Sequence, residues 1–119
     1  MPSPRKLPRL GQAPRRGEVW CVRLDPTLGA EIKKTRPCLV LTTNVVNQFR
    51  RTIVVGPLSR SPQASPAVLV PVICAGRWAM AVVDQVRAVA KERLHRRLGS
   101  VSAEHLRAIE DALREILEL

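Results

Sequence analysis

The residues of this sequence with the clearest chemical potential lie at the end of the segment from Asp25 to Pro37, which joins two predicted strands. Three positive charges gather there, on Lys33, Lys34 and Arg36. The ring of Pro37 disfavours the α region for the residue before it, so Arg36 is held extended. A guanidinium is permanently charged and carries a fork of donors that matches two phosphate oxygens. Arg36 is therefore a candidate for stabilising charge at a phosphorus centre, and the two lysines are candidate phosphate contacts.

Each of these residues also has an ordinary structural interpretation. A surface arginine is commonly the partner of an ion pair, and neighbouring lysines are commonly solvated charges. The spacing alone therefore leaves both interpretations open.

The overall charge favours a polyanionic partner. The 119 residues include 20 Lys and Arg against 10 Asp and Glu, which gives a formal net charge of +10. A surplus of this size in a short chain is typical of proteins that bind polyanions such as nucleic acids. Half of the surplus lies in residues 1–16, where five basic residues occur without an acidic one: Arg5, Lys6, Arg9, Arg15 and Arg16.

The length and the prolines predict one domain preceded by an arm. A chain of 119 residues has room for one core. Prolines break regular structure, and four of them lie at positions 2, 4, 8 and 14. Residues 1–16 are therefore predicted to form a basic, proline-rich, mobile arm, and residues 17–119 a single domain.

The chain shows none of the patterns of a membrane or secreted protein. It has no apolar run near the ~18 residues of a membrane span, and its N-terminus lacks the apolar centre of a secretory signal. Three cysteines without a Cys-x-x-Cys pair support neither a disulfide framework nor a zinc site. We expect a cytoplasmic protein with reduced thiols.

Short apolar runs rich in β-branched residues predict a mainly β fold. Several runs are continuously apolar, which favours strands covered on both faces, as in a small closed barrel. Pro57 and Pro71 are expected at an edge or a bulge, because proline cannot donate to a ladder. The predicted strands are Val19–Leu24, Cys38–Thr42, Ile53–Leu58, Val68–Cys74, Ala79–Val83 and Gln85–Val89.

The C-terminus changes to helical spacing. Leu106, Ile109 and Leu113 recur at the interval of one helix face, and Ser102 is a plausible N-cap. We predict one amphipathic helix that covers an end of the barrel.

Eight short motifs occur in the order in which they occur in the MazF/PemK toxins, and the chain resembles that family from Gly17 to about Leu94. The motifs are Gly17-Glu18-Val19-Trp20, Leu24-Asp25-Pro26, Gly29-x-Glu31, Lys34-Thr35-Arg36-Pro37, Leu39-Val40-Leu41, Asn47-x-Phe49, Val54-Val55-x-Pro57-Leu58-Ser59 and Asp84-Gln85-Val86-Arg87. The resemblance implies an SH3-like barrel of the CcdB/MazF type, a homodimer, sequence-specific cleavage of single-stranded mRNA that inhibits translation, and an acidic antitoxin that binds the toxin dimer. It implies no cofactor and no metal.

The resemblance also implies a catalytic pair, because the family's arginine and its threonine or serine match Arg36 and Ser59. RNA supplies its own nucleophile, the 2′-hydroxyl, so the protein needs only proton handling and charge stabilisation. Cleavage should then leave a 2′,3′-cyclic phosphate. A group with a pKa above ~12 is a poor proton acceptor, so Arg36 is assigned primarily to charge stabilisation.

Further residues are candidate RNA contacts with equally simple structural interpretations. Gln85 has an amide that can bind a base edge or tie two strands together. Asn47 can bond RNA or cap its own turn. Aromatic residues that could stack on bases are scarce, and Trp20 and Trp78 are more typical of a core or a dimer interface.

Two other functions fit the same barrel. One is a non-enzymatic toxin of the CcdB type, which binds gyrase through the end of its C-terminal helix. The other is a basic nucleic-acid-binding barrel that binds duplex and single strands alike without cleaving them.

Overall fold

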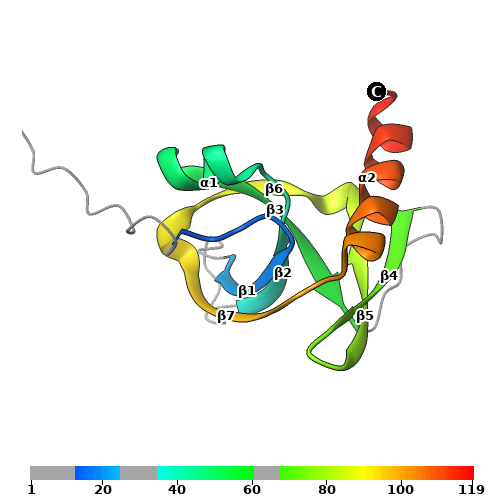
Figure 1. Cartoon of the computed structure of the whole chain (residues 1–119), viewed down its shortest axis with the longest axis horizontal. Helices are drawn as coiled ribbons and strands as arrows, with labels where there is room; N and C mark the ends of the chain where they lie inside the picture. Colours follow the sequence, from blue (N-terminus) through cyan, green and yellow to red (C-terminus); the bar gives the residue numbers. More distant parts are fainter. Residues whose placement is uncertain (1–12, 25–34, 61–67) are drawn as a thin grey trace, which may run out of the picture.

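Seven strands and two α-helices make up the described residues 13–24, 35–60 and 68–119 of the computed structural model (Figure 1). In chain order the elements are β1 (Glu18–Arg23), β2 (Thr35–Val40), α1 (Asn44–Phe49), β3 (Thr52–Ser59), β4 (Leu69–Cys74), β5 (Arg77–Val82), the 3-10 helix η2 (Val83–Gln85), β6 (Arg87–Ala90), the 3-10 helix η3 (Lys91–Arg93), β7 (Leu94–Ser100) and α2 (Ala103–Leu117).

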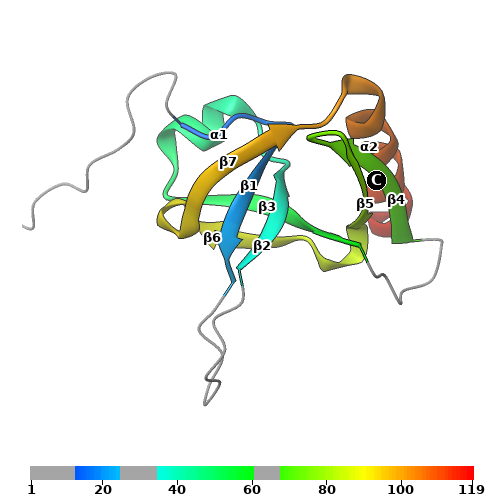
Figure 2. The same cartoon turned by 90° about the horizontal axis from the view of Figure 1, so that it is seen from below.

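The strands form one curled antiparallel sheet in the order β4-β5-β3-β2-β1-β7, with β6 also paired to β3. Figure 2 shows the curl: β1, β2, β3, β6 and β7 wrap around one side, while β4 and β5 lie beside α2. The predicted mainly β barrel with a C-terminal helix is confirmed.

Strand β3 pairs with two different strands along one of its edges. Its first half pairs with β6, up to Val55 opposite Arg87, and its end pairs with β5, from Leu58 opposite Ala81. Pro57 lies between these two stretches, opposite Cys38 of β2. Pro57 was expected at an edge or a bulge. The edge alternative is wrong, because β3 is an interior strand, and the missing N–H of Pro57 falls where one neighbour of β3 gives way to the next. Pro71 lies in the edge strand β4, as expected.

Two apolar clusters fill the curl. One packs the β4–β5 side against α2 and contains Val19, Leu39, Leu58, Val70, Val72, Ala81, Val83 and Ile109. The other lies between β1, β2, β3 and β6 and contains Val22, Cys38, Val40, Ile53, Val55 and Val89. Alternate residues of β2 enter different clusters, which explains why its sequence is continuously apolar.

Helix α2 begins where its capping residue predicts. The Ser102 hydroxyl accepts a hydrogen bond from the backbone N–H of His105 at 3.1 Å. Val101 and Leu106 both pack on the first apolar cluster, and Ile109 is 1% exposed within it. The predicted helix and its N-cap are confirmed. No helix among the described residues is long and apolar enough to span a membrane.

Strand β7 and helix α1 were not predicted, because neither has a clear hydrophobic pattern in the sequence. Strand β7 carries His95, Arg96 and Arg97 in succession, all exposed, so it lacks an apolar run. Helix α1 has six residues, fewer than two turns, and shows too little periodicity to be recognised. Its N-cap, Thr43, accepts a hydrogen bond from the N–H of Val46.

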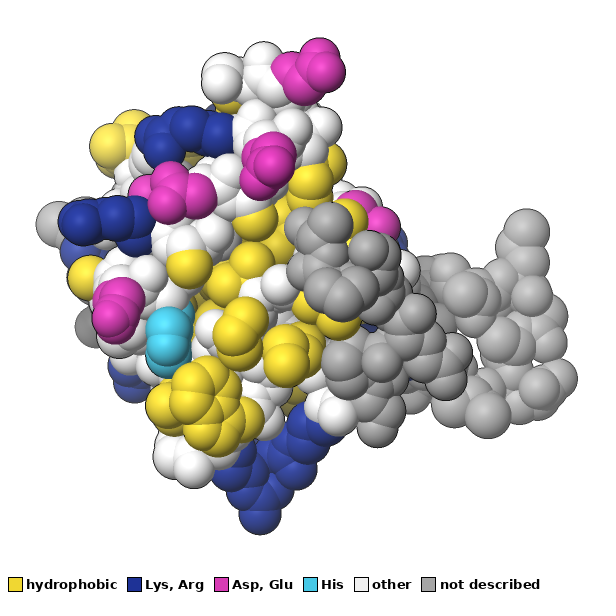
Figure 3. All heavy atoms as spheres, turned by 90° about the vertical axis from the view of Figure 1, so that its right-hand side faces the viewer, with side chains coloured by type: hydrophobic (Ala, Val, Ile, Leu, Met, Phe, Trp, Pro, Cys, Tyr) yellow, Lys and Arg dark blue, Asp and Glu magenta, His cyan; other side chains and the backbone are white. Residues whose placement is uncertain are grey.

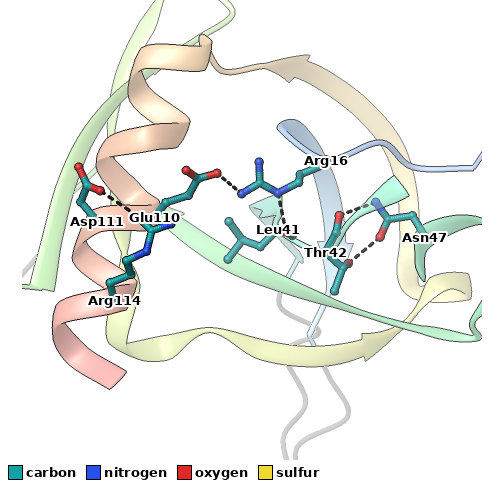
Figure 4. A network of polar contacts seen from close by, with 7 residues as sticks. All are labelled: Arg16, Leu41, Thr42, Asn47, Glu110, Asp111 and Arg114. Carbon is teal, nitrogen blue, oxygen red and sulfur yellow. Dashed lines mark hydrogen bonds and ion pairs between the residues drawn. The ribbon is translucent and has the colours of Figure 1, made fainter. Parts of the chain in front are cut away.

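The domain begins before Gly17, where the arm was predicted to end. Residues 1–12 lie outside the described part of the chain, but Ala13 is buried and Arg16 is fixed at three points. The N–H of Arg16 donates to Asn44 Oδ1 at 2.7 Å and its Nε donates to the Leu41 carbonyl at 3.0 Å. Its Nη2 forms an ion pair with Glu110 of α2 (Figure 4). Residues 13–16 are therefore part of the fold.

Replacing Ile109 with alanine should lower the free energy of unfolding by about 2–5 kcal/mol, because the cavity left at a fully buried site is not refilled. Urea denaturation would measure the change. The matched control is Arg107→Ala on the same helix, where the side chain is exposed and the expected change is within about 0.5 kcal/mol. Equal losses at both positions would contradict the packing of α2 described above.

Candidate functional site

Arg36 and Ser59 lie toward the same end of two neighbouring strands. Cys38 of β2 is opposite Pro57 of β3, and Arg36 and Ser59 are each two residues beyond that pair in the same direction. Since side chains alternate along a strand, the two residues share a face of the sheet. Arg36 is exposed and makes no ion pair among the described residues, and Ser59 is half-buried. Continued two residues past Cys38 and Pro57, this register puts Arg36 opposite Ser59, and their role as a catalytic pair stays a prediction.

A groove runs past this end of the strands. It has a volume of about 420 Å³ and includes Ser59 and Pro37, the neighbour of Arg36. Its floor is apolar, with Val19, Leu58 and Leu98 among the lining residues. Three exposed arginines also line it: Arg60, Arg77 and Arg96. A groove with an apolar floor and cationic walls suits a single-stranded nucleic acid, whose phosphates are anionic and whose bases have flat apolar faces.

Two guanidinium groups, those of Arg87 and Arg36, act electrostatically on the buried thiol of Cys38. Burial raises the pKa of Cys38 to about 12, and the positive charges of Arg87 and Arg36 partly oppose that rise. Arg87 pairs with Val55 of β3, so it enters this region from β6. Two guanidinium groups therefore approach the end of the second apolar cluster from different strands.

Several residues of this region were not predicted from the sequence. Arg87 was part of a recognised motif but was given no role, and Arg60 and Arg77 were not singled out. Arg60 directly follows Ser59 and could have been noticed there, whereas Arg77 has no neighbouring signal because β5 reaches the groove only through its pairing with β3 and β4.

Of the other candidate RNA contacts, Gln85 is accessible, and two lie outside the described residues. Gln85 is exposed at the end of η2, where its amide is accessible. Lys33 and Lys34 lie outside the described residues. His105 is committed to the fold, because its Nδ1 accepts a hydrogen bond from the N–H of Ile73 at 3.2 Å. Among the described residues, no group of three or more His, Cys, Asp or Glu could hold a metal ion.

Asn47 must be removed from the candidate RNA surface, because its side chain is in the interior. It is 0% exposed. Its Nδ2 donates to the Thr42 carbonyl at 2.9 Å, and its Oδ1 accepts from the Thr42 hydroxyl at 2.6 Å (Figure 4). The same hydroxyl accepts from the N–H of Val54 at 3.3 Å. Asn47 therefore ties α1 to the strands on either side of it.

Comparison with known proteins identifies the family. The model of the PemK-like, MazF-like toxins of type II toxin–antitoxin systems matches residues 15–117. The chain belongs to this family. It is 33% identical over 114 residues to the endoribonuclease MazF9 of Mycobacterium tuberculosis, covering 88% of this chain and 97% of that protein. It is 26% identical over 110 residues to the endoribonuclease EndoA of Bacillus subtilis, covering 88% and 95%.

Solved structures of MazF proteins share the fold of this toxin. A MazE–MazF complex from Deinococcus radiodurans superposes with a TM-score of 0.78 at 21% identity, covering 90% of this chain and 97% of that chain. A mycobacterial endoribonuclease in complex with its cognate antitoxin gives a TM-score of 0.69 at 23% identity, covering 90% and 97%. The family predicted from the motifs is confirmed, and the fold with it.

Replacing Asn47 with alanine should destabilise the toxin by about 1–3 kcal/mol, because the polar groups of Thr42 lose their partner in the interior. Denaturant titration would measure this. Gln85→Ala is the matched amide control, and because Gln85 is exposed its expected stability change is within about 0.5 kcal/mol. Unchanged stability of the Asn47 variant would show that its bonds to Thr42 contribute nothing.

The Cys38 thiol should resist alkylation in the native toxin. A pKa of about 12 keeps it protonated at pH 8, and only the thiolate reacts with iodoacetamide. Mass spectrometry should find Cys38 unlabelled in native protein and labelled in urea. Because the folded pKa is raised, Cys38 contributes stability below its ordinary pKa near 9, and this is lost as pH rises toward 12. Rapid native labelling at pH 8 would contradict the burial.

Proposed function

We propose that this toxin is an endoribonuclease that cleaves single-stranded mRNA at specific sequences without a metal ion and thereby inhibits translation. The observation that supports the proposal is that Arg36, which is exposed, and Ser59 lie toward the same end of neighbouring strands, where Ser59 lines a groove with three exposed arginines. Its relatives MazF9 and EndoA are endoribonucleases. A permanent cation and a hydroxyl are sufficient where the substrate provides the nucleophile.

The proposed reaction is an internal transfer within the RNA. The 2′-oxygen of one ribose forms a bond to the adjacent phosphorus, and the bond from phosphorus to the 5′-oxygen of the next nucleotide breaks. The 2′-hydroxyl gives up its proton to solvent, and the leaving 5′-oxygen gains one. The products are a 2′,3′-cyclic phosphate and a 5′-hydroxyl.

Arg36 stabilises the negative charge that grows on the non-bridging oxygens as phosphorus becomes five-coordinate. Ser59 donates a hydrogen bond to the departing 5′-oxygen. Arg87 adds a second positive charge at this end of the sheet, and the amide of Gln85 is a candidate reader of a base edge. Lys33 and Lys34 keep their proposed role as phosphate contacts.

The proposed partners follow from charge and from exposed apolar surface. A net charge of +10 favours an acidic antitoxin, and a mycobacterial relative has been solved with its cognate antitoxin. A homodimer is supported by apolar side chains left exposed at the end of α2, namely Ile116, Leu117 and Leu119. The proposed location is the cytoplasm, where mRNA is translated.

Arg36→Ala and Ser59→Ala should each lower the cleavage rate about 10²- to 10³-fold, the usual effect of removing one group that stabilises the transition state. The measurement is cleavage of a defined single-stranded RNA in excess EDTA, with the new ends mapped. Ser59→Thr keeps the hydroxyl and should remain active.

Arg50→Ala is the matched control, because it removes an exposed arginine beside the start of β3, at the far end of that strand from Ser59. It should cleave at nearly the wild-type rate. Cleavage that requires a metal ion, or an Arg36→Ala variant as active as the control, would overturn the proposed function.

A further inference from the structure

Trp78 of β5 stands out among the aromatic residues of the toxin. The chain has two tryptophans, one phenylalanine and no tyrosine. Trp20 packs against the second apolar cluster, with its Nε1 donating to Glu18 at 3.0 Å. Phe49 belongs to α1 and does not line the groove. Trp78 is 60% exposed and lines the groove together with Ser59.

We propose that Trp78 is the surface on which a nucleobase of the RNA stacks, next to the phosphate that is cleaved. This inference rests on the proposed ribonuclease function and names a binding residue for it. It assigns to an exposed indole a role that the motifs do not indicate.

The strand register puts Trp78 on the same face as Ser59. Ser59 of β3 pairs with Met80 of β5, and Trp78 is two residues from Met80, so all three side chains point the same way. The alternate residues Ala79 and Ala81 pack in or against the first apolar cluster on the other face. Two residues along a strand span about 7 Å, which puts the indole within one nucleotide's reach of the Ser59 hydroxyl.

The indole of Trp78 packs against the ring of His105. Its ring lies 5.8 Å from the His105 ring, tilted by 51°. The His105 ring is held in place because its Nδ1 accepts a hydrogen bond from the backbone N–H of Ile73, the residue opposite Trp78 on β4. The backbone N–H of His105 donates to the Ser102 hydroxyl. A ring already held in position loses little conformational entropy when a base stacks on it.

The side chains around Trp78 carry positive charges that can bind the phosphates of a nucleic acid. Arg60, Arg77 and Arg96 line the same groove, and Arg77 is adjacent to Trp78 in β5. Aromatic faces for bases beside cations for phosphates are the common basis of single-strand binding. Figure 3 shows hydrophobic side chains gathered on this side of the molecule, with Lys and Arg side chains at the border.

The test compares side chains of different kinds at position 78. If a base stacks there, Trp78→Ala should weaken binding about 5- to 150-fold, and Trp78→Phe should keep most of the affinity because it keeps a π-face. Trp78→Leu is the matched control, since it keeps an apolar side chain without a π-face, and it should behave like alanine. The probe is a 2′-O-methylated, uncleavable copy of the RNA oligonucleotide that the wild-type toxin cleaves.

A second measurement locates the base. In a Trp20→Phe background, Trp78 is the only tryptophan, and its fluorescence should be quenched as the probe binds. Probes with one abasic position at a time should identify a single nucleotide whose loss weakens wild-type binding but has no further effect on Trp78→Ala. Circular dichroism and urea denaturation confirm that each variant is folded.

The outcomes separate this inference from the function on which it rests. If the wild type cleaves RNA and Arg36→Ala does not, but Trp78→Ala binds the probe normally, only the stacking proposal fails. It fails equally if Trp78→Leu binds as well as Trp78→Phe, or if the loss of binding accompanies a change in sedimentation mass, which would show that a second copy of the toxin covers the ring. If the wild type neither cleaves nor binds RNA, the proposed function fails as well.

Discussion

Strand β3 is the constraint on which the rest of this structure depends, because it hydrogen-bonds to β2, to β6 and to β5. Its change of neighbour divides the interior into two apolar clusters, one under α2 and one inside the curl of β1, β2 and β6. Pro57 fits at the change because a residue without an N–H is tolerated where no ladder bond is required. Ser59 ends the strand just beyond this point, so the feature that divides the core also brings a hydroxyl to the groove.

The sequence predicted well those features that local physics determines. Pro37 restricts Arg36, β-branched runs form strands, and Ser102 caps a helix whose apolar face recurs at helical spacing; each of these effects acts within a few residues. The order of the motifs added the family, which is confirmed, whereas the role of Arg36 and Ser59 as a catalytic pair stays a prediction.

Features that depend on distant pairing could not be predicted in the same way. The groove combines residues from β1, β2, β3, β4, β5 and β7, and no local pattern shows that Arg60, Arg77 and Arg96 meet there. Asn47 illustrates the opposite error: a polar residue in a recognised motif suggested a contact with RNA, whereas its amide satisfies the backbone and hydroxyl of Thr42 in the interior. Burial, which decides between the two roles of a polar side chain, is a property of the whole fold.

The pairing of β1 with β7 has a consequence for the synthesis of this protein. The first strand finds one of its two neighbours about eighty residues later, and Arg16 finds its acidic partner Glu110 later still. Contacts so distant in sequence cannot form on the ribosome until β7 and α2 have emerged. A nascent chain that has not yet exposed β7 therefore lacks the β1–β7 pairing and the part of the groove that Arg96 and Leu98 line.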